Sequence, residues 1–302
     1  MKNNNQILEP KSNFNQIKDN LYSLRTETED NETKIDWVIL TFMILIHIVA
    51  LIGGLFYFSW ANLFGAIFLY WLFSGVGIGF CFHRLLSHRS FTVPQWLESI
   101  LVILGTLSYQ GSPIFWVGNH RMHHAHCDTV KDPYNATLGF FWSHVVWTLY
   151  RRNSIHFDYK VYSKYVPELT EKPLCRFLHQ WTVELQLFLA LCFYIVGGWS
   201  LVIYGCFVRL VISWHLTWLV NSACHLWGKQ PFEVTENANN LWWVALLTFG
   251  EGWHNTHHAY PKSARYGLMW WQIDMNYGLI WVLQKLRLAE QVCLKYGNFS
   301  DY

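Results

Sequence analysis

The amino-acid sequence predicts an all-α membrane protein in which four transmembrane helices, paired as two hairpins, lie under a cytosolic helical cap. Hydrophobic residues make up 52% of the 302 residues and charged residues 14%, against about 25% charged in a typical soluble protein. Four apolar stretches are long enough to cross a bilayer, and nine histidines cluster near the ends of such stretches. The first two observations predict the membrane domain, and the third predicts a metal site in the cap.

The four apolar stretches cover residues 37–58, 63–82, 181–196 and 201–219. Each approaches the roughly 20 residues that a transmembrane helix needs. A short turn near 59–62 joins the first two stretches, and Gly197-Gly198 joins the last two, so two helical hairpins are predicted. A further apolar stretch at 96–109 is shorter and follows a proline, and we expect it to lie at the membrane interface.

The basic residues indicate which way the hairpins face. Neither hairpin turn contains Lys or Arg, and 21 of the 22 basic residues lie outside the apolar stretches. By the positive-inside rule, both termini and the large loops are therefore expected in the cytoplasm. Arg209, inside the fourth stretch, is expected to face the interior of the helix bundle. The expected domain covers 35–290, with the cap at 83–180 and 220–290, and polar tails cover 1–34 and 291–302.

Composition also excludes some classes of protein. The net charge is +2 and no basic stripe is present, which argues against nucleic-acid binding. The seven cysteines are odd in number and form no C-x-x-C motif, which argues against a disulfide framework or a zinc ribbon. We interpret the cysteines beside apolar segments as small hydrophobic residues.

Nine of the fifteen histidines fall into four short motifs. These are H-x-x-x-x-H at His83 and His88, H-x-x-H-H at His120, His123, His124 and again at His254, His257, His258, and N-x-x-x-H at Asn221 and His225. On a helix, the first and the last two histidines of H-x-x-H-H share one face. The adjacent pair diverges by about 100°, so its members can reach two different ions. The ends of H-x-x-x-x-H diverge by about 140° on an α-helix, so we expect this motif to straddle a helix end.

Nine histidines are too many for one metal ion and suit two ions with four or five ligands each. Imidazole binds iron, zinc, copper and nickel, but zinc usually stops at four ligands. The motifs contain no thiolate, which argues against an iron–sulfur centre. Soluble di-iron bundles use paired Glu-x-x-His motifs; this chain has one, Glu251-x-x-His254, so we expect Glu251 to support a ligand from outside the coordination sphere.

Histidines at a membrane interface can also cap helices or anchor at headgroups, but that role does not explain four spaced motifs on one predicted side. We expect a structural or surface role for the six histidines outside the motifs, which are His47, His126, His144, His156, His179 and His215.

The blocks around these motifs resemble the membrane fatty acid desaturases, and most closely their delta-9 branch. The resemblance covers roughly 37–290. The blocks are HRLLSHRSF at 83–91, HRMHHAHCDTVKDP at 120–133, WLVNSACHLWG at 218–228 and NLWWVALLTFGEGWHNTHHAY at 240–260. Three histidine boxes and N-x-x-x-H in this order are a specific signal, and the last two blocks look most like the cyanobacterial acyl-lipid type.

The resemblance implies a di-iron centre that activates O2, removes two hydrogens from a saturated acyl chain and leaves a cis double bond, with delta-9 as the expected position. It implies that the nine histidines of the motifs hold the two irons and that Asn221 holds one iron through a water molecule. It also places Trp71 and Gly75 near the closed end of an acyl tunnel, where Trp71 is expected to limit chain length; packing or lipid contact is the alternative role for Trp71.

The resemblance leaves several points open. The acyl group can be carried on CoA or on a glycerolipid. The tails contain no H-P-G-G haem-binding stretch, so electrons are expected from a separate ferredoxin or cytochrome b5. The multi-pass chain is expected in a bacterial inner or thylakoid membrane, or in the endoplasmic reticulum. A hydroxylase on the same scaffold is the nearest alternative function, and a metal-binding membrane transporter is the alternative from another class.

Overall fold

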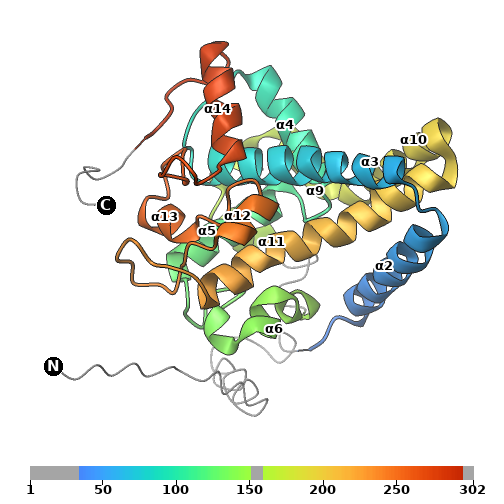
Figure 1. Cartoon of the computed structure of the whole chain (residues 1–302), viewed down its shortest axis with the longest axis horizontal. Helices are drawn as coiled ribbons and strands as arrows, with labels where there is room; N and C mark the ends of the chain where they lie inside the picture. Colours follow the sequence, from blue (N-terminus) through green and yellow to red (C-terminus); the bar gives the residue numbers. More distant parts are fainter. Residues whose placement is uncertain (1–33, 151–158, 295–302) are drawn as a thin grey trace.

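The computed structural model describes residues 34–150 and 159–294, and within these ranges the regular secondary structure is helical (Figure 1). Isolated β-bridges, such as that between Ile35 and Tyr150, are the only strand-like pairings there. The expected N-terminal tail lies outside the described residues apart from Lys34, and so does the expected C-terminal tail beyond 294. The predicted all-α class is confirmed for the described part of the chain.

Among the residues that the structure describes, three helical stretches are long and apolar enough to cross a membrane. They are Trp37–Phe56, Trp60–Ser87 and Thr182–Leu226, with mean hydropathies of 2.7, 1.8 and 2.1. The first is α2 (Trp37–Phe56), and the second joins α3 (Trp60–Tyr70) to η2 (Trp71–Ser87). The third joins α10 (Thr182–Val202), η6 (Ile203–Val208) and α11 (Arg209–Leu226).

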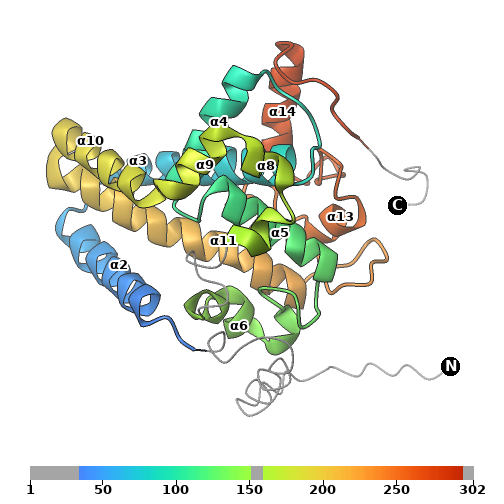
Figure 2. The ribbon, with the colours of Figure 1, turned by 180° about the vertical axis from the view of Figure 1, so that it is seen from behind.

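The third stretch is not one straight helix. At Gly198 the backbone leaves the helical region, with φ 61° and ψ −160°, a conformation that glycine adopts without the steric cost of a Cβ. Beyond the turn, Gly205 packs against the Phe193 ring of α10, which shows that the two arms lie side by side. The turn predicted at Gly197-Gly198 is therefore confirmed, and Figure 2 shows α10 folded back beside α11.

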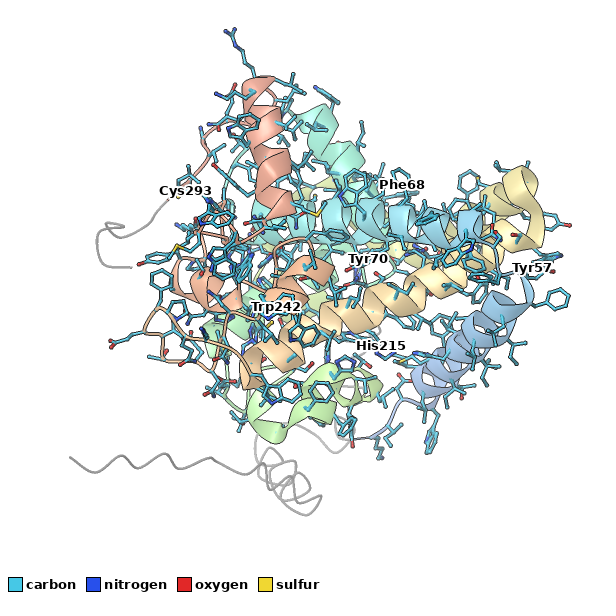
Figure 3. The ribbon with its side chains drawn as sticks, viewed as in Figure 1. Tyr57, Phe68, Tyr70, His215, Trp242 and Cys293 are labelled. Atoms are coloured by element: carbon cyan, nitrogen blue, oxygen red, sulfur yellow. The ribbon has the colours of Figure 1, made fainter. Side chains whose placement is uncertain are left out.

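The two turns lie against each other at one end of the molecule. Asn62 donates from Nδ2 to Ser200 Oγ at 2.7 Å and to the Tyr57 carbonyl at 2.8 Å. Ser59 begins α3 by accepting from the Asn62 amide. Figure 3 places Tyr57 at this end, away from Trp242 near the opposite end. Side chains around the turns point outward, with Phe56 and Val196 both 80% exposed, as expected of residues that face lipid.

The second half of the Trp60–Ser87 helix has π-helical geometry, in which backbone bonds join residues five apart. It is almost entirely buried and packs on α4 (Gln95–Leu107). A Cβ added at Gly77 would lie 2.6 Å from the Gly105 backbone, so these two glycines allow the helices to touch. The helix expected at 96–109 is thus α4, and it covers η2.

Arg209 lies in the interior as predicted. It is 1% exposed, and its guanidinium donates to the carbonyls of Leu107 and Ser108 at 3.2 and 3.1 Å. These carbonyls belong to the C-terminal end of α4, where the helix dipole is negative and carbonyls lack helical partners. The buried cation therefore ties α11 to the end of α4.

The remaining elements lie mainly toward the C-terminal ends of η2 and α11, away from the two hairpin turns (Figure 1). They are α5 (Pro113–His126), η3 (Ala136–Leu138), α6 (Phe140–His144), η4 (Val146–Leu149), α7 (Tyr159–Ser163), α8 (Pro167–Glu171), α9 (Pro173–Gln180), α12 (Trp242–Leu247), α13 (His254–Ala259) and α14 (Met275–Lys285). The main apolar core lies where η2 meets α4, α5 and α14.

Three histidines that we expected to be structural or surface residues join helices to one another. His47 of α2 contacts His215 of α11 through their Nε2 atoms at 3.0 Å. His215 Nδ1 in turn lies 3.0 Å from His144 Nε2 of α6, and His144 Nδ1 lies 3.0 Å from Ser222 Oγ. Such polar contacts between helices in an apolar setting stabilise their packing, so the structural role expected for these three residues fits their places.

Candidate metal centre

Four helical segments bring the nine histidines of the motifs together in two groups. His83 lies near the C-terminal end of η2 and His88 caps that helix. An H-x-x-H-H motif lies on each of α5 and α13, and the last turn of α11 carries His225. The first group, whose ligand atoms lie within 4.8 Å of one another, is His83, His88, His120, His124 and His257. The second is His123, Cys127, His225 and His258.

The π-helical geometry of η2 explains how the first motif brings His83 and His88 together. The His88 amide donates to the His83 carbonyl at 3.1 Å, a bond between residues five apart. On an α-helix these two side chains would diverge, but i→i+5 bonding stacks them on one face. Their ring centroids lie 4.9 Å apart. The motif does straddle the helix end, as predicted, because η2 ends at Ser87 and His88 is its cap.

Each H-x-x-H-H helix contributes to both groups. On α5, His124 faces the first group and His123 the second. On α13, His257 faces the first group and His258 the second. This division follows from the divergence of adjacent residues on a helix. The adjacent pairs therefore reach two separate centres, as their spacing indicated.

The Nε2 atoms of the first group point at one another. His257 Nε2 lies 3.1 Å from His83 Nε2 and 2.8 Å from His124 Nε2. His88 Nε2 lies 2.8 Å from His120 Nε2. A neutral imidazole carries one N–H, so facing pairs of this kind need either one donor per pair or a shared cation.

His254 belongs with the second group. Its Nε2 atom lies 2.9 Å from His225 Nε2 and 3.0 Å from His258 Nε2. The His123 ring lies beside those of His225 and His258, with centroids 5.1 and 5.4 Å apart. The two groups thus hold five and four histidines.

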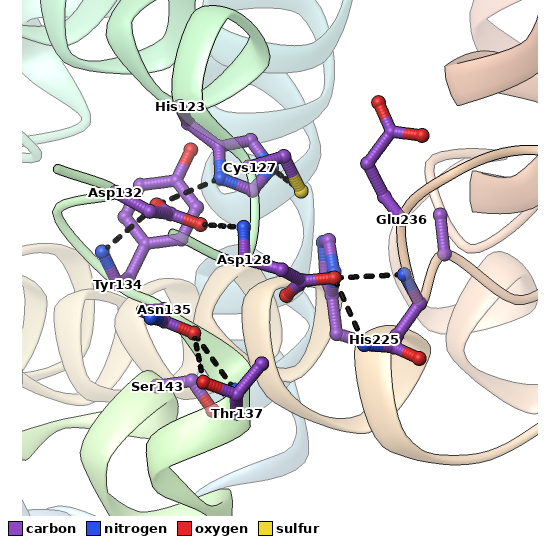
Figure 4. A network of polar contacts seen from close by, with 12 residues as sticks. His123, Cys127, Asp128, Asp132, Tyr134, Asn135, Thr137, Ser143, His225 and Glu236 are labelled. Atoms are coloured by element: carbon purple, nitrogen blue, oxygen red, sulfur yellow. Dashed lines mark hydrogen bonds and ion pairs between the residues drawn. The ribbon is translucent and has the colours of Figure 1, made fainter. Parts of the chain in front are cut away.

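Carboxylates approach the outer nitrogens of three of these histidines. Glu251 accepts from His83 Nδ1, and Asp132 Oδ1 lies 2.9 Å from His123 Nδ1. Asp128 Oδ1 lies 4.0 Å from His225 Nδ1, which has no hydrogen-bond partner among the described residues. Figure 4 shows Asp132 beside His123, and Asp128 between Asp132 and His225. A carboxylate on Nδ1 holds the proton there and leaves Nε2 free to bind a metal.

Glu251 is itself held by a buried cation. The Arg84 side chain is 0% exposed and binds Glu251 at 2.9 Å and Asp274 at 2.9 Å. Burial alone would raise the pKa of Glu251, but the Arg84 charge and the His83 contact lower it to about 2. Glu251 therefore stays an anion that accepts the His83 proton, which is the supporting position that the sequence suggested for it.

The electrostatics of the two groups suit metal ions. Burial, followed by repulsion from neighbouring histidines, lowers the pKa of His120, His124 and His257 well below the ordinary 6.5. The same causes act on His254 and His258. These imidazoles are therefore neutral at pH 7, the form that coordinates a metal. Because His83 donates from Nδ1, its Nε2 is an acceptor that faces His257 Nε2, and a cation between the rings satisfies such lone pairs. The residues present fit two metal ions.

Acid is expected to empty and destabilise this centre. Histidines whose pKa is lowered on folding bind fewer protons in the folded chain than in the unfolded chain, so stability is complete above about pH 6.5 and declines as the pH falls below it. We expect metal content and the unfolding temperature in detergent to fall together between pH 7.5 and pH 5. Unchanged metal content after dialysis at pH 5 would contradict this expectation.

Two cavities meet beside the histidines. The larger, of about 340 Å³, is reached from α2 and α10, and the smaller, of about 60 Å³, lies deeper beside η2. Five residues line both: Trp116, His120, Tyr134, Thr217 and Asn221. Because they share these lining residues, the two cavities adjoin as one channel whose exposed surface is mostly apolar, although its inner part also borders the polar side chains of His83, His123 and Glu251.

Aromatic side chains form part of the wall of the inner cavity. Tyr70 and Phe249 line it, with ring centroids 5.0 Å apart. Trp71 and Gly75 are not among its lining residues. Gly75 lies behind Phe249, because a Cβ added there would be 2.8 Å from the Phe249 ring and 3.2 Å from Trp71 Cδ1. Gly75 thus packs against Phe249 and Trp71 and does not line this cavity.

Sequence reasoning missed three residues of this site. Cys127, Asp128 and Asp132 follow the second histidine motif, and all three lie against the second group. Cys127 is four residues after His123, the spacing that places two side chains on one helix face. This spacing was a usable signal, whereas the carboxylate contacts depend on the loop after α5.

Comparisons with known proteins agree with this geometry. The profile of the fatty acid desaturase family matches residues 58–282. An sn-2 palmitoyl-lipid 9-desaturase of Nostoc sp. (strain 36) is 48% identical over 263 residues, which cover 87% of this chain and 92% of that protein. An sn-1 stearoyl-lipid 9-desaturase of Anabaena variabilis is 45% identical over 89% of this chain and 98% of that protein. The resemblance to the delta-9 branch is confirmed, and the chain is an oxidoreductase that belongs to the fatty acid desaturase family.

Proposed function

We propose that this chain is a membrane-embedded, O2-dependent di-iron desaturase that introduces a cis double bond at the delta-9 position of a saturated acyl chain carried on a glycerolipid. The observation that carries the proposal is that two adjoining cavities both have His120 and Asn221 in their walls, while the inner one is also lined by Tyr70 and Phe249. The names of the Nostoc and Anabaena relatives specify lipid-linked acyl chains, and they favour a glycerolipid over CoA as the carrier.

In this proposal the two histidine groups hold one iron each. When bound, the irons supply the oxidising chemistry that removes two hydrogens from an unactivated chain with O2. The set of ligands is His83, His88, His120, His123, His124, His225, His254, His257 and His258, with Asn221 acting through a water molecule. Glu251, Asp132 and Asp128 orient ligands from behind.

The channel positions the chain, because a saturated chain has no polar handle near its middle. Gln110 donates to Ser213 and Thr217 at 3.0 Å each where the two cavities meet. In this proposal the polar contact forms part of the wall beside Trp116 that guides the chain past the histidines. The carbons next to His120 and Asn221 are then selected by their distance from the head group.

We further propose that the helices make four spans with both termini in the cytoplasm. The reversal at Gly198 and the contact of Asn62 with Ser200 support two hairpins whose turns share one side of the membrane. The histidine groups lie at the other ends of these helices. Electrons are expected from a separate ferredoxin or cytochrome b5. Each donor can be tested by reducing it with dithionite and adding it to the purified chain. A reduced donor that does not support turnover would be rejected as the electron donor.

The direct test is the lipid profile of a bacterial host without a desaturase of its own, with and without this chain and a donor. We expect new monoenes with the double bond at carbon 9 of glycerolipid acyl chains, located by mass spectrometry. They should be absent with His123→Ala. Hydroxylated chains would establish the alternative oxygenase, and product confined to acyl-CoA would overturn the glycerolipid carrier. Unchanged lipids with folded, iron-loaded protein would overturn the acyl substrate.

The closed end of the channel predicts a change in chain-length preference. Phe249→Ala removes the ring that ends the inner cavity, and Trp71→Ala removes support behind it. We expect both variants to shift products toward acyl chains longer by two or more carbons, more strongly for Phe249→Ala. Gly75→Ala should shift products toward shorter chains, because its new Cβ pushes the Phe249 ring forward. Chain-length distributions measured by gas chromatography check this, and three unchanged distributions would contradict it.

A further inference from the structure

We propose that Cys127 is a ligand of the second metal ion, so that this ion is bound by one thiolate and by imidazoles. The inference rests on the proposed di-iron function and deepens it. It concerns a side chain outside the histidine motifs. Cys127 caps the C-terminal end of α5, one turn after His123.

The position of the sulfur is the first argument. Cys127 Sγ lies 3.7 Å from His123 Nε2. It lies within 4.8 Å of the ligand nitrogens of His225 and His258. Sulfur and nitrogen ligands at about 2.3 and 2.1 Å from one ion lie about 3.1 to 3.6 Å from each other at octahedral or tetrahedral angles. The measured separation is close to that of two ligands of one metal, and Figure 4 shows the sulfur beside the His123 ring.

The count of ligands is the second argument. The first group holds five histidines and the second four. Cys127 makes the two groups equal, at five side chains each. Asn221 does not fill the same place, because it lines the acyl channel and Cys127 lies near Asp128 and Asp132 on the loop after α5. The second ion therefore has room for Cys127 on one side and for a water held by Asn221 on the channel side.

The loop after α5 fixes the thiol in this position. Asp132 binds His123 Nδ1 with Oδ1 and accepts from the Asp128 amide with Oδ2 at 3.0 Å. Asp128 adopts a positive φ of 58° and accepts from the Asn237 amide at 2.8 Å. The residues that follow Cys127 are thus tied both to a histidine of the site and to the loop that follows α11, which preorganises the ligand.

Coordination makes the two ions chemically different. On metal binding, the Cys127 S–H bond breaks, the proton passes to the buffer and a sulfur–metal bond forms. The first ion then has neutral imidazole ligands from the chain, and the second has one anionic sulfur. A thiolate is softer than imidazole and donates more electron density to its metal.

The test uses the full-length chain in detergent, stripped of metal and reloaded with Co²⁺. We expect two Co²⁺ per chain and a near-ultraviolet thiolate-to-cobalt charge-transfer band. Cys127→Ala should lose this band, keep the absorption of imidazole-bound cobalt, and bind the second Co²⁺ at least about tenfold more weakly. The matched control is Cys293→Ala, which removes a partly buried thiol outside both groups and should keep the band.

A second readout does not require a variant that folds. Maleimide should alkylate Cys127 in the metal-free chain and be blocked by Co²⁺, whereas Cys293 should react equally in both states. An unchanged charge-transfer band in Cys127→Ala would overturn the inference and leave the di-iron proposal intact. Alkylation of Cys127 at the same rate with and without Co²⁺ would do the same. A wild-type chain that binds no Co²⁺ would overturn both. Cobalt–sulfur coordination in a chain that makes no desaturated lipid would overturn the proposed function alone.

Discussion

His257→Ala is expected to abolish desaturation and to release metal. The His257 ring lies in the middle of the first group, with Nε2 at 3.1 Å from His83 and 2.8 Å from His124. It is 0% exposed, so the ring is enclosed by the rest of the protein. Mutation of a residue that hydrogen-bonds to a metal ligand typically lowers metal affinity or activity by about 10- to 100-fold. Loss of a ligand itself should lower them further. We expect at least about a 100-fold loss of monoene product and fewer than two irons per chain.

The matched control for this variant is His126→Ala. His126 lies on α5, the helix that carries three of the clustered histidines, but it contacts Tyr165 at 3.2 Å on another face. Product yield and iron content should stay near wild type. Iron analysis by mass spectrometry and product analysis by gas chromatography distinguish the two variants. A His257→Ala chain with full iron content and normal product would remove His257 from the centre.

The local features of the metal centre could be predicted from the sequence because helix geometry fixes them. Adjacent histidines in H-x-x-H-H diverge on any α-helix, and the structure sends His123 and His124 to different groups, and likewise His257 and His258. The hairpin turn at Gly198 could also be predicted, since paired glycines between apolar stretches permit a sharp reversal of the chain. These inferences needed no knowledge of what packs against the helix.

The remaining features depend on tertiary packing. The π-helical segment Trp71–Ser87 was not predicted, because apolar periodicity does not distinguish it from an α-helix and its buried setting comes from α4 and α14. The contact of His47 with His215 joins residues 168 positions apart, and no motif marks it. Asp132 reaches His123 through the turn at Asp128, whose positive φ is not evident from the sequence. Functional residues were therefore missed where a loop, rather than a helix, sets their position.

Arg84→Met is expected to be strongly destabilising, although it removes no proposed metal ligand. Arg84 is fully buried and neutralises both Glu251 and Asp274, each at 2.9 Å. Its guanidinium also donates to the Ala264 carbonyl at 2.8 Å and lies 4.0 Å from the centre of the Tyr266 ring. Removing one partner of a buried ion pair typically costs about 3–5 kcal/mol, because the other charges remain buried without compensation. The unfolding temperature in detergent should fall by several degrees.

The same change should weaken the metal centre, because Glu251 connects Arg84 to His83. Without the Arg84 charge the pKa of Glu251 rises, which weakens its hold, as an anion, on the His83 Nδ1 proton. Iron content should therefore fall together with stability. Arg89→Met is the matched control: Arg89 is 64% exposed and pairs with Glu168 at the surface, where an ion pair contributes less than about 1 kcal/mol. If Arg84→Met lowered the unfolding temperature but left iron content intact, the link from Arg84 through Glu251 to His83 would be wrong, while the buried ion pair would keep its structural role.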